Sequence, residues 1–283
     1  MKELNYDKLN AFIASDIIQP FYKIRLERLE FAKLANIAKR KNPYLFKAKN
    51  IETAGDLAKG LLDAFLSSQE ETIFGDLMEN LAIHVCHQVF NGAKAQQGKY
   101  RSVDLIFERD GKTYIVGIKS GPNWGNSDQI NIMRKNFKKA RALIRSELGK
   151  KDLVAVNGCI YGKDNVPHKV NKDPDISYYK ICGQAFWELI SGDDQLYKKL
   201  IQPLDKEAKN TPFPNASNLK YPLITTACYQ YAARTYPELI SDGRIVKAEV
   251  FGATPDEEVL VQADNISRHM SHQLLGEDTA WEE

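Results

Sequence analysis

The chain has 283 residues, 43% of them hydrophobic, which is enough for about one to one and a half domains with a sizeable core. Its formal net charge of +2 at pH 7 is only mildly basic and excludes a histone-like protein that binds nucleic acid through bulk charge. No run of 18 apolar residues occurs, and charged residues interrupt the N-terminal stretch, so neither a membrane span nor a signal peptide is expected. The four cysteines are far apart and form no CxxC pair, which argues against disulfides and zinc and favours a reducing, cytoplasmic location.

The pattern along the chain divides it into three regions. Residues 1–50 predict an N-terminal helical region that is split near Pro20 and carries nine basic and two acidic residues between Lys23 and Lys49. This local positive charge suits a nucleic-acid partner. Residues 51–203 predict an α/β core. Residues 204–283 predict a C-terminal subdomain with a helix near 223–234 and a strand pair near 244–262.

The start of the core predicts two helices, over residues 52–66 and 70–90. Ser67 followed by Glu70 forms a capping box, which predicts that the second helix begins there. The apolar stripe of the second helix consists of Phe74, Leu77, Met78, Leu81 and Val85. Glu79 lies beside this stripe, with the small residues Gly75 and Ala82 about one turn away on either side. Small neighbours allow another segment to approach closely, so Glu79 can reach a site beyond its own helix.

Residues 103–120 predict a β-hairpin that carries one acid and one amine. Asp104 lies within the first apolar run, Lys119 ends the second, and Asp110-Gly111 between them is a strong turn signal because glycine tolerates positive φ. The runs show little alternation, which indicates burial on both faces, so each charge needs a partner. A bulge would bring the two residues into register. Two interpretations stay open: a plain cross-strand salt bridge, or a site for a metal and a phosphate.

A turn-rich loop and a basic helix follow Lys119. The loop from Ser120 to Ser127 contains asparagines and a tryptophan, which suit hydrogen bonding and stacking, and Ser127 or Asp128 can cap the helix. The apolar face of the helix consists of Ile130, Met133, Phe137, Ala140 and Ile144. Its other face carries Arg134, Lys135, Lys138, Lys139, Arg141 and Arg145. Such a charged face is most often only solvated, but its place directly after the pair favours contact with phosphates.

The ordered motifs resemble the PD-(D/E)xK nucleases. Asp104 followed by Gly117-Ile118-Lys119 matches the general motif, in which an acid and an acid-x-Lys lie on adjacent strands. The longer string that continues through Ser120 to Gln129 is similar to type II restriction endonucleases of the PmeII kind and to related enzymes that cut interrupted GG-N-CC-type sites. Further matches are Phe74 to Glu79, Asn42 to Asn50, the predicted strand 153–160 and the segment Gly183 to Leu189. The resemblance covers roughly residues 40–200.

This resemblance implies a fold and an activity. The implied fold is an α/β restriction-endonuclease-like core, a mixed sheet flanked by helices, with N-terminal helical and C-terminal additions. The implied activity is that of a type II site-specific deoxyribonuclease, which uses Mg²⁺ to hydrolyse double-stranded DNA and leaves 5′-phosphates. A homodimer is expected, together with a cognate DNA methyltransferase that acts on the same site without needing to bind the enzyme.

The resemblance also assigns residues. Asp104 and the Ile118 carbonyl would bind the metal, and Lys119 would orient the attacking water and counter the phosphate charge. The motif's second acid is Gly117 here, so another carboxylate must replace it, and Glu79 is our choice. Glu108 would lie about 13 Å along the strand from Asp104, too far for a shared metal. Candidate DNA contacts are Asn123, Trp124, Asn126, Gln129, Arg134 and Lys138, and the loop after Gly162 is a further candidate for reading bases.

Two other functions stay open from the sequence. The chain is also compatible with a structure-specific or repair nuclease of the same fold. Because Gly117 has no carboxylate, a catalytically inactive DNA-binding relative is the other alternative.

Overall fold

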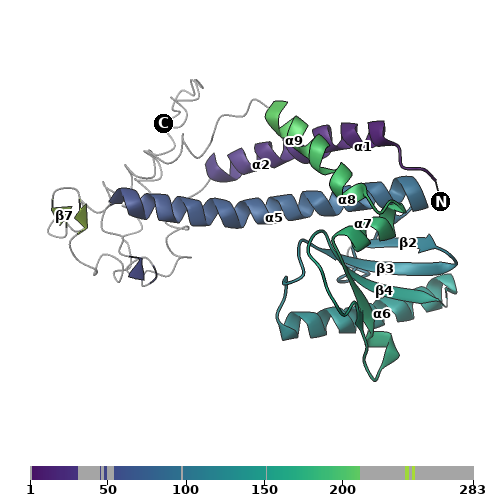
Figure 1. Ribbon diagram of the computed structural model, residues 1–283. Coiled ribbons are helices and arrows are strands. Elements are labelled where there is room, and N and C mark those ends of the chain that lie inside the picture. Colours follow the sequence, from purple (N-terminus) through teal and green to yellow (C-terminus); the bar gives the residue numbers. More distant parts are fainter. Residues whose placement is uncertain are drawn as a thin grey trace, which may run out of the picture. The chain divides into compact units, whose positions relative to one another are not determined.

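The computed structural model describes residues 2–30, 45, 48–49, 54–96, 98–150, 152–210, 240–241 and 244–245 (Figure 1). The chain forms two compact units, one of Met1–Phe21 with Phe74–Thr211 and one of Tyr22–Ile73 with Pro212–Glu283. The three-region division predicted from the sequence remains a proposal. The predicted helix near 223–234 lies outside the described residues. The same holds for the predicted strand pair, apart from the two-residue antiparallel strands β7 (Ile240–Ser241) and β8 (Arg244–Ile245).

The N-terminal segment is helical without a break. Helix α1 (Tyr6–Phe12) continues through a π-helical segment (Ile13–Ile18) into α2 (Gln19–Glu30). The predicted split near Pro20 is therefore wrong. In a regular α-helix the proline ring clashes with the carbonyl four residues earlier. The wider π turn, in which the Gln19 N–H donates to the Ala14 carbonyl, precedes the proline and lets the helix continue.

Helix α5 (Ala54–Phe90) is a single element where two helices were expected. Ser67 and Ser68 are exposed within it, and the Thr72 hydroxyl donates to the Ser68 carbonyl. The predicted start at residue 70 is wrong because the capping box is only a local preference. No glycine or proline interrupts residues 61–74, and the apolar positions continue as the buried Leu66 and Ile73.

A six-stranded mixed sheet forms the centre of the first unit, in the order β1-β2-β3-β4-β6-β5. Its strands are β1 (Ala93–Lys94), β2 (Leu105–Arg109), β3 (Lys112–Lys119), β4 (Leu153–Cys159), β5 (His168–Lys169) and β6 (Tyr178–Cys182). Strands β3, β4 and β6 are parallel, and the other pairs are antiparallel. This confirms the expected mixed α/β core. The carboxyl ends of the three parallel strands meet at one edge of the sheet.

The hairpin of β2 and β3 is regular. Its register runs from Leu105 opposite Val116 to Arg109 opposite Lys112, so the expected bulge is absent from this pair of strands. Asp110 and Gly111 have φ values of 51° and 74°, and two successive residues with positive φ match the twist of a two-residue hairpin turn. The turn predicted from Asp-Gly is confirmed.

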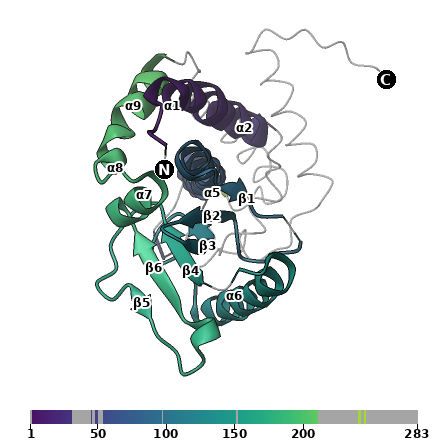
Figure 2. The ribbon, with the colours of Figure 1, turned by 90° about the vertical axis from the view of Figure 1, so that its right-hand side faces the viewer.

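Helices cover both faces of the sheet (Figures 1 and 2). On one face lies α6 (Ser127–Leu148), whose Phe137 and Ile144 pack with Ile115 and Tyr178 in a buried cluster. On the other face lie the end of α5 and α7 (Gln184–Ser191), where the Phe186 ring fills the space beside Gly158. The remaining elements of this unit are the 3₁₀ turn η2 (Pro174–Ile176), α8 (Leu196–Lys199) and α9 (Ile201–Asn210). Packing on both faces explains the nearly continuous apolar runs of β3 and β4.

The described helices include none that is both long and apolar enough to cross a membrane. Cys86, Cys159 and Cys182 are buried as free thiols, and Cys228 lies outside the described residues. Burial raises the pKa of the Cys86 thiol to about 12.

Candidate active site

Asp104 and Lys119 lie together at the edge where β3 ends. The backbone of Asp104 is bonded on both sides, since its N–H donates to the Val116 carbonyl and its own carbonyl accepts from the Ala95 N–H. Its carboxylate Oδ2 accepts from the Ile118 N–H at 2.7 Å and lies 3.9 Å from Lys119 Nζ. The side chains are 23% and 32% exposed, so both remain accessible to a ligand. The sheet therefore holds the acid in place and leaves its second oxygen available.

Besides Asp104, two further groups lie close to the amine of Lys119. Its Nζ donates to the Ile118 carbonyl at 2.7 Å and lies 5.6 Å from the centroid of the Trp124 ring. The Trp124 indole N–H donates to Asn157 Oδ1 at 2.9 Å, and Asn157 Nδ2 donates to the Gly117 carbonyl at 3.3 Å. Asn157 is only 1% exposed. Sequence reasoning missed this residue, although a single amide within the apolar run of β4 was a usable signal.

Helix α5 brings Glu79 toward the same site. A Cβ at Gly75 would lie 2.8 Å from Ser120 Oγ, so the helix approaches the loop after β3 as closely as the small residue allows. Glu79 follows one turn later, and its side chain is 24% exposed. The competing acid, Glu108, instead pairs with Lys150 at 2.5 Å and is 59% exposed.

The charges of the site act on Glu79. Its pKa is raised, first by burial and then by the negative charge of Asp104, while Lys94 and Lys119 oppose the shift. Lys94 Nζ lies 3.5 Å from Glu79 Oε1. The structure thus brings Glu79, Asp104 and Lys119 into one electrostatic group and adds Lys94. No sequence signal marked Lys94, because its strand has only two residues.

Replacing Glu79 by Gln should raise the melting temperature at pH 7 in EDTA. A raised folded-state pKa means that ionised Glu79 lowers stability above that pKa, and the loss disappears as the pH falls below the ordinary value of 4.5. The variant and wild type should therefore converge at about pH 4. Calorimetry at both pH values checks this. Asp76→Asn, exposed on the same helix, serves as the control with no expected change. A lower melting temperature for E79Q at pH 7 would contradict the inference that ionised Glu79 lowers the stability of the fold.

The available donors fit a magnesium ion. The Asp104 and Glu79 carboxylates and the Ile118 carbonyl are hard oxygen ligands, which Mg²⁺ prefers together with several waters. Burial and then the negative charge of Asp104 raise the pKa of Glu79, and a cation beside the two carboxylates would relieve their repulsion. Within the part of the chain that the structure describes, no three His, Cys, Asp or Glu side chains form a larger ligand cluster. The residues present thus suit an ion that keeps part of its water shell.

The loop after β3 ends in a capping box. Asn126 is the N-cap of α6: its Oδ1 accepts from the Gln129 N–H, and Gln129 Oε1 accepts from the Asn126 N–H, both at 3.0 Å. The expected cap at Ser127 or Asp128 is therefore wrong, because the helix begins one residue earlier than predicted. Capping uses the oxygens of the two amides and leaves their NH₂ donors available. Asn123 in the same loop is exposed.

A comparison with known protein families covers the residues of this site. A family model for the type II restriction endonuclease EcoO109I matches residues 7–212. The chain belongs to this family. The matched region contains Glu79, Asp104, Lys119 and the loop up to Gln129. The protein is accordingly a restriction endonuclease, a hydrolase that acts on DNA, of a family that generally uses Mg²⁺. Among curated proteins no match was found.

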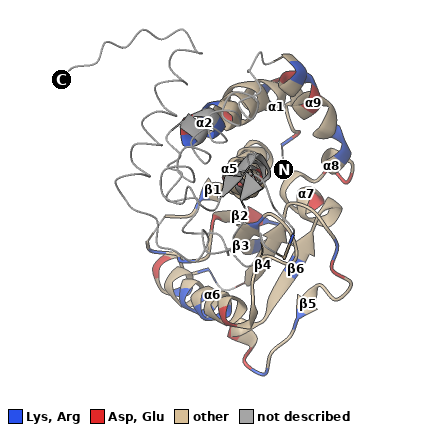
Figure 3. Cartoon of the chain, turned by 90° about the vertical axis from the view of Figure 1, so that its left-hand side faces the viewer, with Lys and Arg blue, Asp and Glu red and all other residues tan. Residues whose placement is uncertain are grey.

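The basic face of α6 in this restriction endonuclease is partly turned inward. Arg141 is only 7% exposed, and its Nη1 donates to the carbonyl oxygens of residues 174, 175 and 177. Lys138 pairs with Asp173 at 2.7 Å, and Arg145 pairs with Asp175 at 2.9 Å. Figure 3 shows both signs of charge on this helix. Three of the six cations of α6 therefore contact the segment around η2, and contact of this face with phosphates stays a prediction.

The other three cations of α6 differ among themselves. The Arg134 guanidinium lies 5.4 Å from the centroid of the Tyr178 ring, and its Nε is buried without a hydrogen-bond partner. Lys135 and Lys139 are exposed. Of the two α6 residues expected to bind DNA, Lys138 thus has an ion-pair partner and Arg134 an aromatic one.

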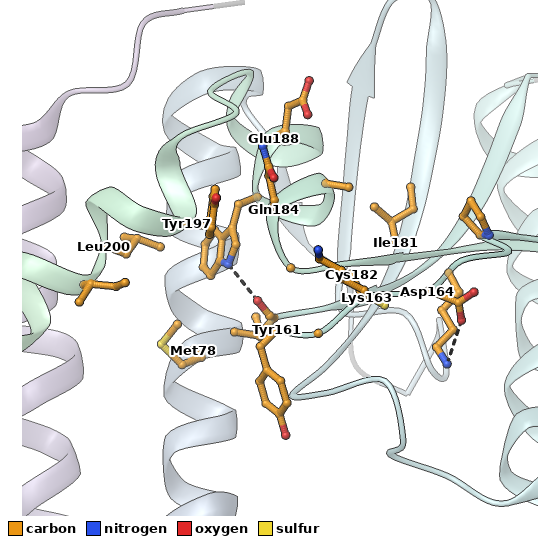
Figure 4. A pocket seen from close by; sticks show the side chains of 18 of the residues that line it. Met78, Tyr161, Lys163, Asp164, Ile181, Cys182, Gln184, Glu188, Tyr197 and Leu200 are labelled. Atoms are coloured by element: carbon orange, nitrogen blue, oxygen red, sulfur yellow. Dashed lines mark hydrogen bonds and ion pairs between the residues drawn. The ribbon is translucent and has the colours of Figure 1, made fainter.

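A separate cavity of about 770 Å³ adjoins the site of the endonuclease. Met78, Tyr161 and Leu200 are among the residues that line it (Figure 4). Glu79, Asp104 and Lys119 are not among them. Tyr161 lies between this cavity and the edge of the sheet that holds Asp104 and Lys119. Its ring lies against Gly121, where a Cβ would be 2.5 Å from Tyr161 Cζ.

The structure leaves no room for a side chain at Gly117 on β3. A Cβ at this position would lie 2.5 Å from the Ser102 carbonyl oxygen and 3.4 Å from Cζ of Phe137. The backbone of a neighbouring segment thus occupies the space where a carboxylate would begin. A carboxylate at this position is therefore incompatible with the observed packing.

Adding a side chain at Gly117 should therefore destabilise the protein. We expect Gly117→Ala to lower the free energy of unfolding by about 1–3 kcal/mol, the usual effect of overpacking a core. Gly117→Asp should be at least as harmful and should not raise cleavage. Urea unfolding of both variants checks this, with Lys112→Ala as the control, because Lys112 is exposed at the start of the same strand. A stable and more active G117D would overturn the packing argument.

Proposed function

We propose that this enzyme is a Mg²⁺-dependent type II site-specific deoxyribonuclease that cuts both strands of double-stranded DNA and leaves 5′-phosphates. The observation that carries the proposal is the ion pair of Asp104 and Lys119 beside the Ile118 carbonyl, within a chain of the EcoO109I family. Glu79, whose pKa responds to both charges, supports it as the third group.

The residues divide the work of hydrolysis. Asp104, Glu79 and the Ile118 carbonyl would hold Mg²⁺, which when bound supplies positive charge for the scissile phosphate and the leaving 3′ oxygen. Lys119 orients the attacking water and offsets the phosphate charge. Its Nζ donates to the Ile118 carbonyl, and the second lone pair of that oxygen is available as a metal ligand at the same time. The Trp124 ring, 5.6 Å from Nζ, is a further contact of the amine.

DNA contacts are proposed from the loop and from α6. The residues are Asn123, Trp124, Asn126, Gln129, Arg134 and Lys138. The exposed Asn123 and the amide NH₂ groups of Asn126 and Gln129 suit base edges or phosphate oxygens. Trp124 acts through its position beside Lys119, since its N–H already donates to Asn157. Lys138 would have to exchange Asp173 for a phosphate.

The target and partners follow from the resemblance to enzymes that cut interrupted sites. We propose a palindromic target of the GG-N-CC type, read by a homodimer whose two-fold axis matches that of the site. A cognate methyltransferase would protect the same site in the cytoplasm without binding the enzyme.

Digestion of phage DNA of known sequence tests the function. Discrete fragments with Mg²⁺, no cutting with EDTA, and mapped ends that ligate without prior phosphorylation are the expected result. Cutting only at junctions or free ends would favour a repair nuclease. Binding without cutting at any metal concentration would favour an inactive relative, the alternative suggested by Gly117.

A further inference from the structure

The segment between β4 and β6 leaves the sheet at the catalytic edge. The Ile160 N–H donates to the Lys119 carbonyl at 2.9 Å, and the Tyr161 N–H donates to the Ser120 carbonyl at 3.2 Å. The segment therefore begins directly beside the catalytic lysine. Any duplex bound at that lysine passes close to the residues that follow.

Partly buried ion pairs stabilise this segment. Asp164 accepts from the Val166 N–H at 2.9 Å and pairs with Lys169 at 2.7 Å and Lys180 at 3.3 Å. Its side chain is only 13% exposed. The far end of the segment is fixed by Arg141, through the three backbone carbonyls described above. A loop that is ordered in advance loses little conformational freedom when it binds.

The outward side of the segment carries a different set of groups. Lys163, Asn165 and His168 are exposed, and Val166 and Val170 are 65% and 69% exposed. The acids of the segment are neutralised within the protein, Asp164 by two lysines and Asp173 by Lys138, so the outer surface presents cationic and amide donors.

We propose that residues 163–170 enter the major groove and read base edges, with Lys163 and Asn165 as specificity residues. The inference rests on the proposed DNA cleavage and names where its sequence selection resides. Lysine donates well to the two acceptors of guanine, and the carboxamide of asparagine can donate to guanine or accept from the amino group of cytosine. Asp164 and Asp173 are paired within the protein, whereas the exposed Lys163 and Asn165 are hydrogen-bond donors. This charge pattern favours DNA over a second copy of the chain as the partner of the segment.

The experiment measures selectivity at the mapped site. Wild type, Lys163→Ala and Asn165→Ala are compared on a duplex with the mapped site and on duplexes with one base pair changed. Each variant should cut the intact site about 5- to 150-fold more slowly, the range of one bidentate base contact. Each should also lose discrimination at one base pair and keep it at the others. Lys112→Ala, at the opposite end of β3, is the matched control with unchanged rates.

Several results would overturn the inference. Equal slowing on all duplexes together with a lower melting temperature would mean a structural loop. Unchanged selectivity in both variants would show that residues 163–170 do not read bases. Site-specific cutting by wild type would still support the proposed function. A third result would assign the surface to subunit contact. In that case the double variant Val166→Asp with Val170→Asp dissociates a dimer, as measured by sedimentation, while K163A keeps the selectivity of wild type. Failure of wild type to cut any site would remove both proposals.

Discussion

Asp104→Asn is expected to lower the rate of DNA cleavage on the order of 10³-fold or more. Without the charge of the metal, the transition state loses several kcal/mol of stabilisation. Asparagine keeps an oxygen that can accept from the Ile118 N–H, so the fold should persist. The substitution removes the charge that pairs with Lys119 and would hold Mg²⁺. Single-turnover cleavage of the mapped duplex measures the effect, and gel-shift binding of the same duplex should persist.

The control for this substitution is Asp110→Asn. Asp110 lies in the hairpin turn with φ of 51°, a conformation that asparagine also tolerates, so neither rate nor stability should change. Cleavage by D104N at close to the wild-type rate would remove Asp104 from the site. Loss of both binding and folding would instead show that the carboxylate acts through the sheet.

Lys119→Ala is expected to lower the cleavage rate on the order of 10²- to 10³-fold, as when one preorganised charge-stabilising donor is removed. The amine lies 3.9 Å from Asp104 Oδ2 and is 32% exposed, so it can reach both a water and a phosphate beside that acid. The loss should appear in the single-turnover rate more than in DNA affinity, because the interaction strengthens as charge develops. Titration of Mg²⁺ should not restore the rate.

Two further variants make this test specific. Lys112→Ala removes a lysine from the other end of the same strand and should leave the rate unchanged. Asn157→Ala leaves Lys119 in place but removes the acceptor of the Trp124 N–H, so a smaller loss is expected if the ring only positions the amine. A K119A rate within a few-fold of wild type would contradict the catalytic assignment.

Part of the site was predictable because its signals are local. Asp110-Gly111 specified the turn, and the spacing of Asp104 and Lys119 from that turn placed both at one edge of the sheet. The small residue Gly75, one turn before Glu79, indicated a close approach, and Ser120 Oγ lies 2.8 Å from where a Cβ at Gly75 would be. Each of these signals can be read from residues within a few positions of one another in the chain.

Other parts could not be judged from local patterns. The six cations of α6 suggested one phosphate-binding face, yet Arg141, Lys138 and Arg145 contact a segment about 30 residues away. The capping box at Ser67 was overridden within α5, where burial of Leu66 and Ile73 continues across it. In both cases a distant partner decided between two locally acceptable arrangements.

The sequence by itself determined the α/β class, the hairpin with Asp104 and Lys119, and the resemblance to type II restriction endonucleases, because periodicity, turn chemistry and motif order depend on neighbours along the chain. Only the tertiary structure decided that a side chain at Gly117 has no room, that Glu79 lies in one electrostatic group with Asp104, and which cations of α6 are paired within the protein. Those outcomes depend on contacts between segments far apart in the chain: the Ser102 carbonyl fills the space beside Gly117, and α5 carries Glu79 to the sheet edge. Pairing of charges across such distances leaves no periodic trace in the sequence.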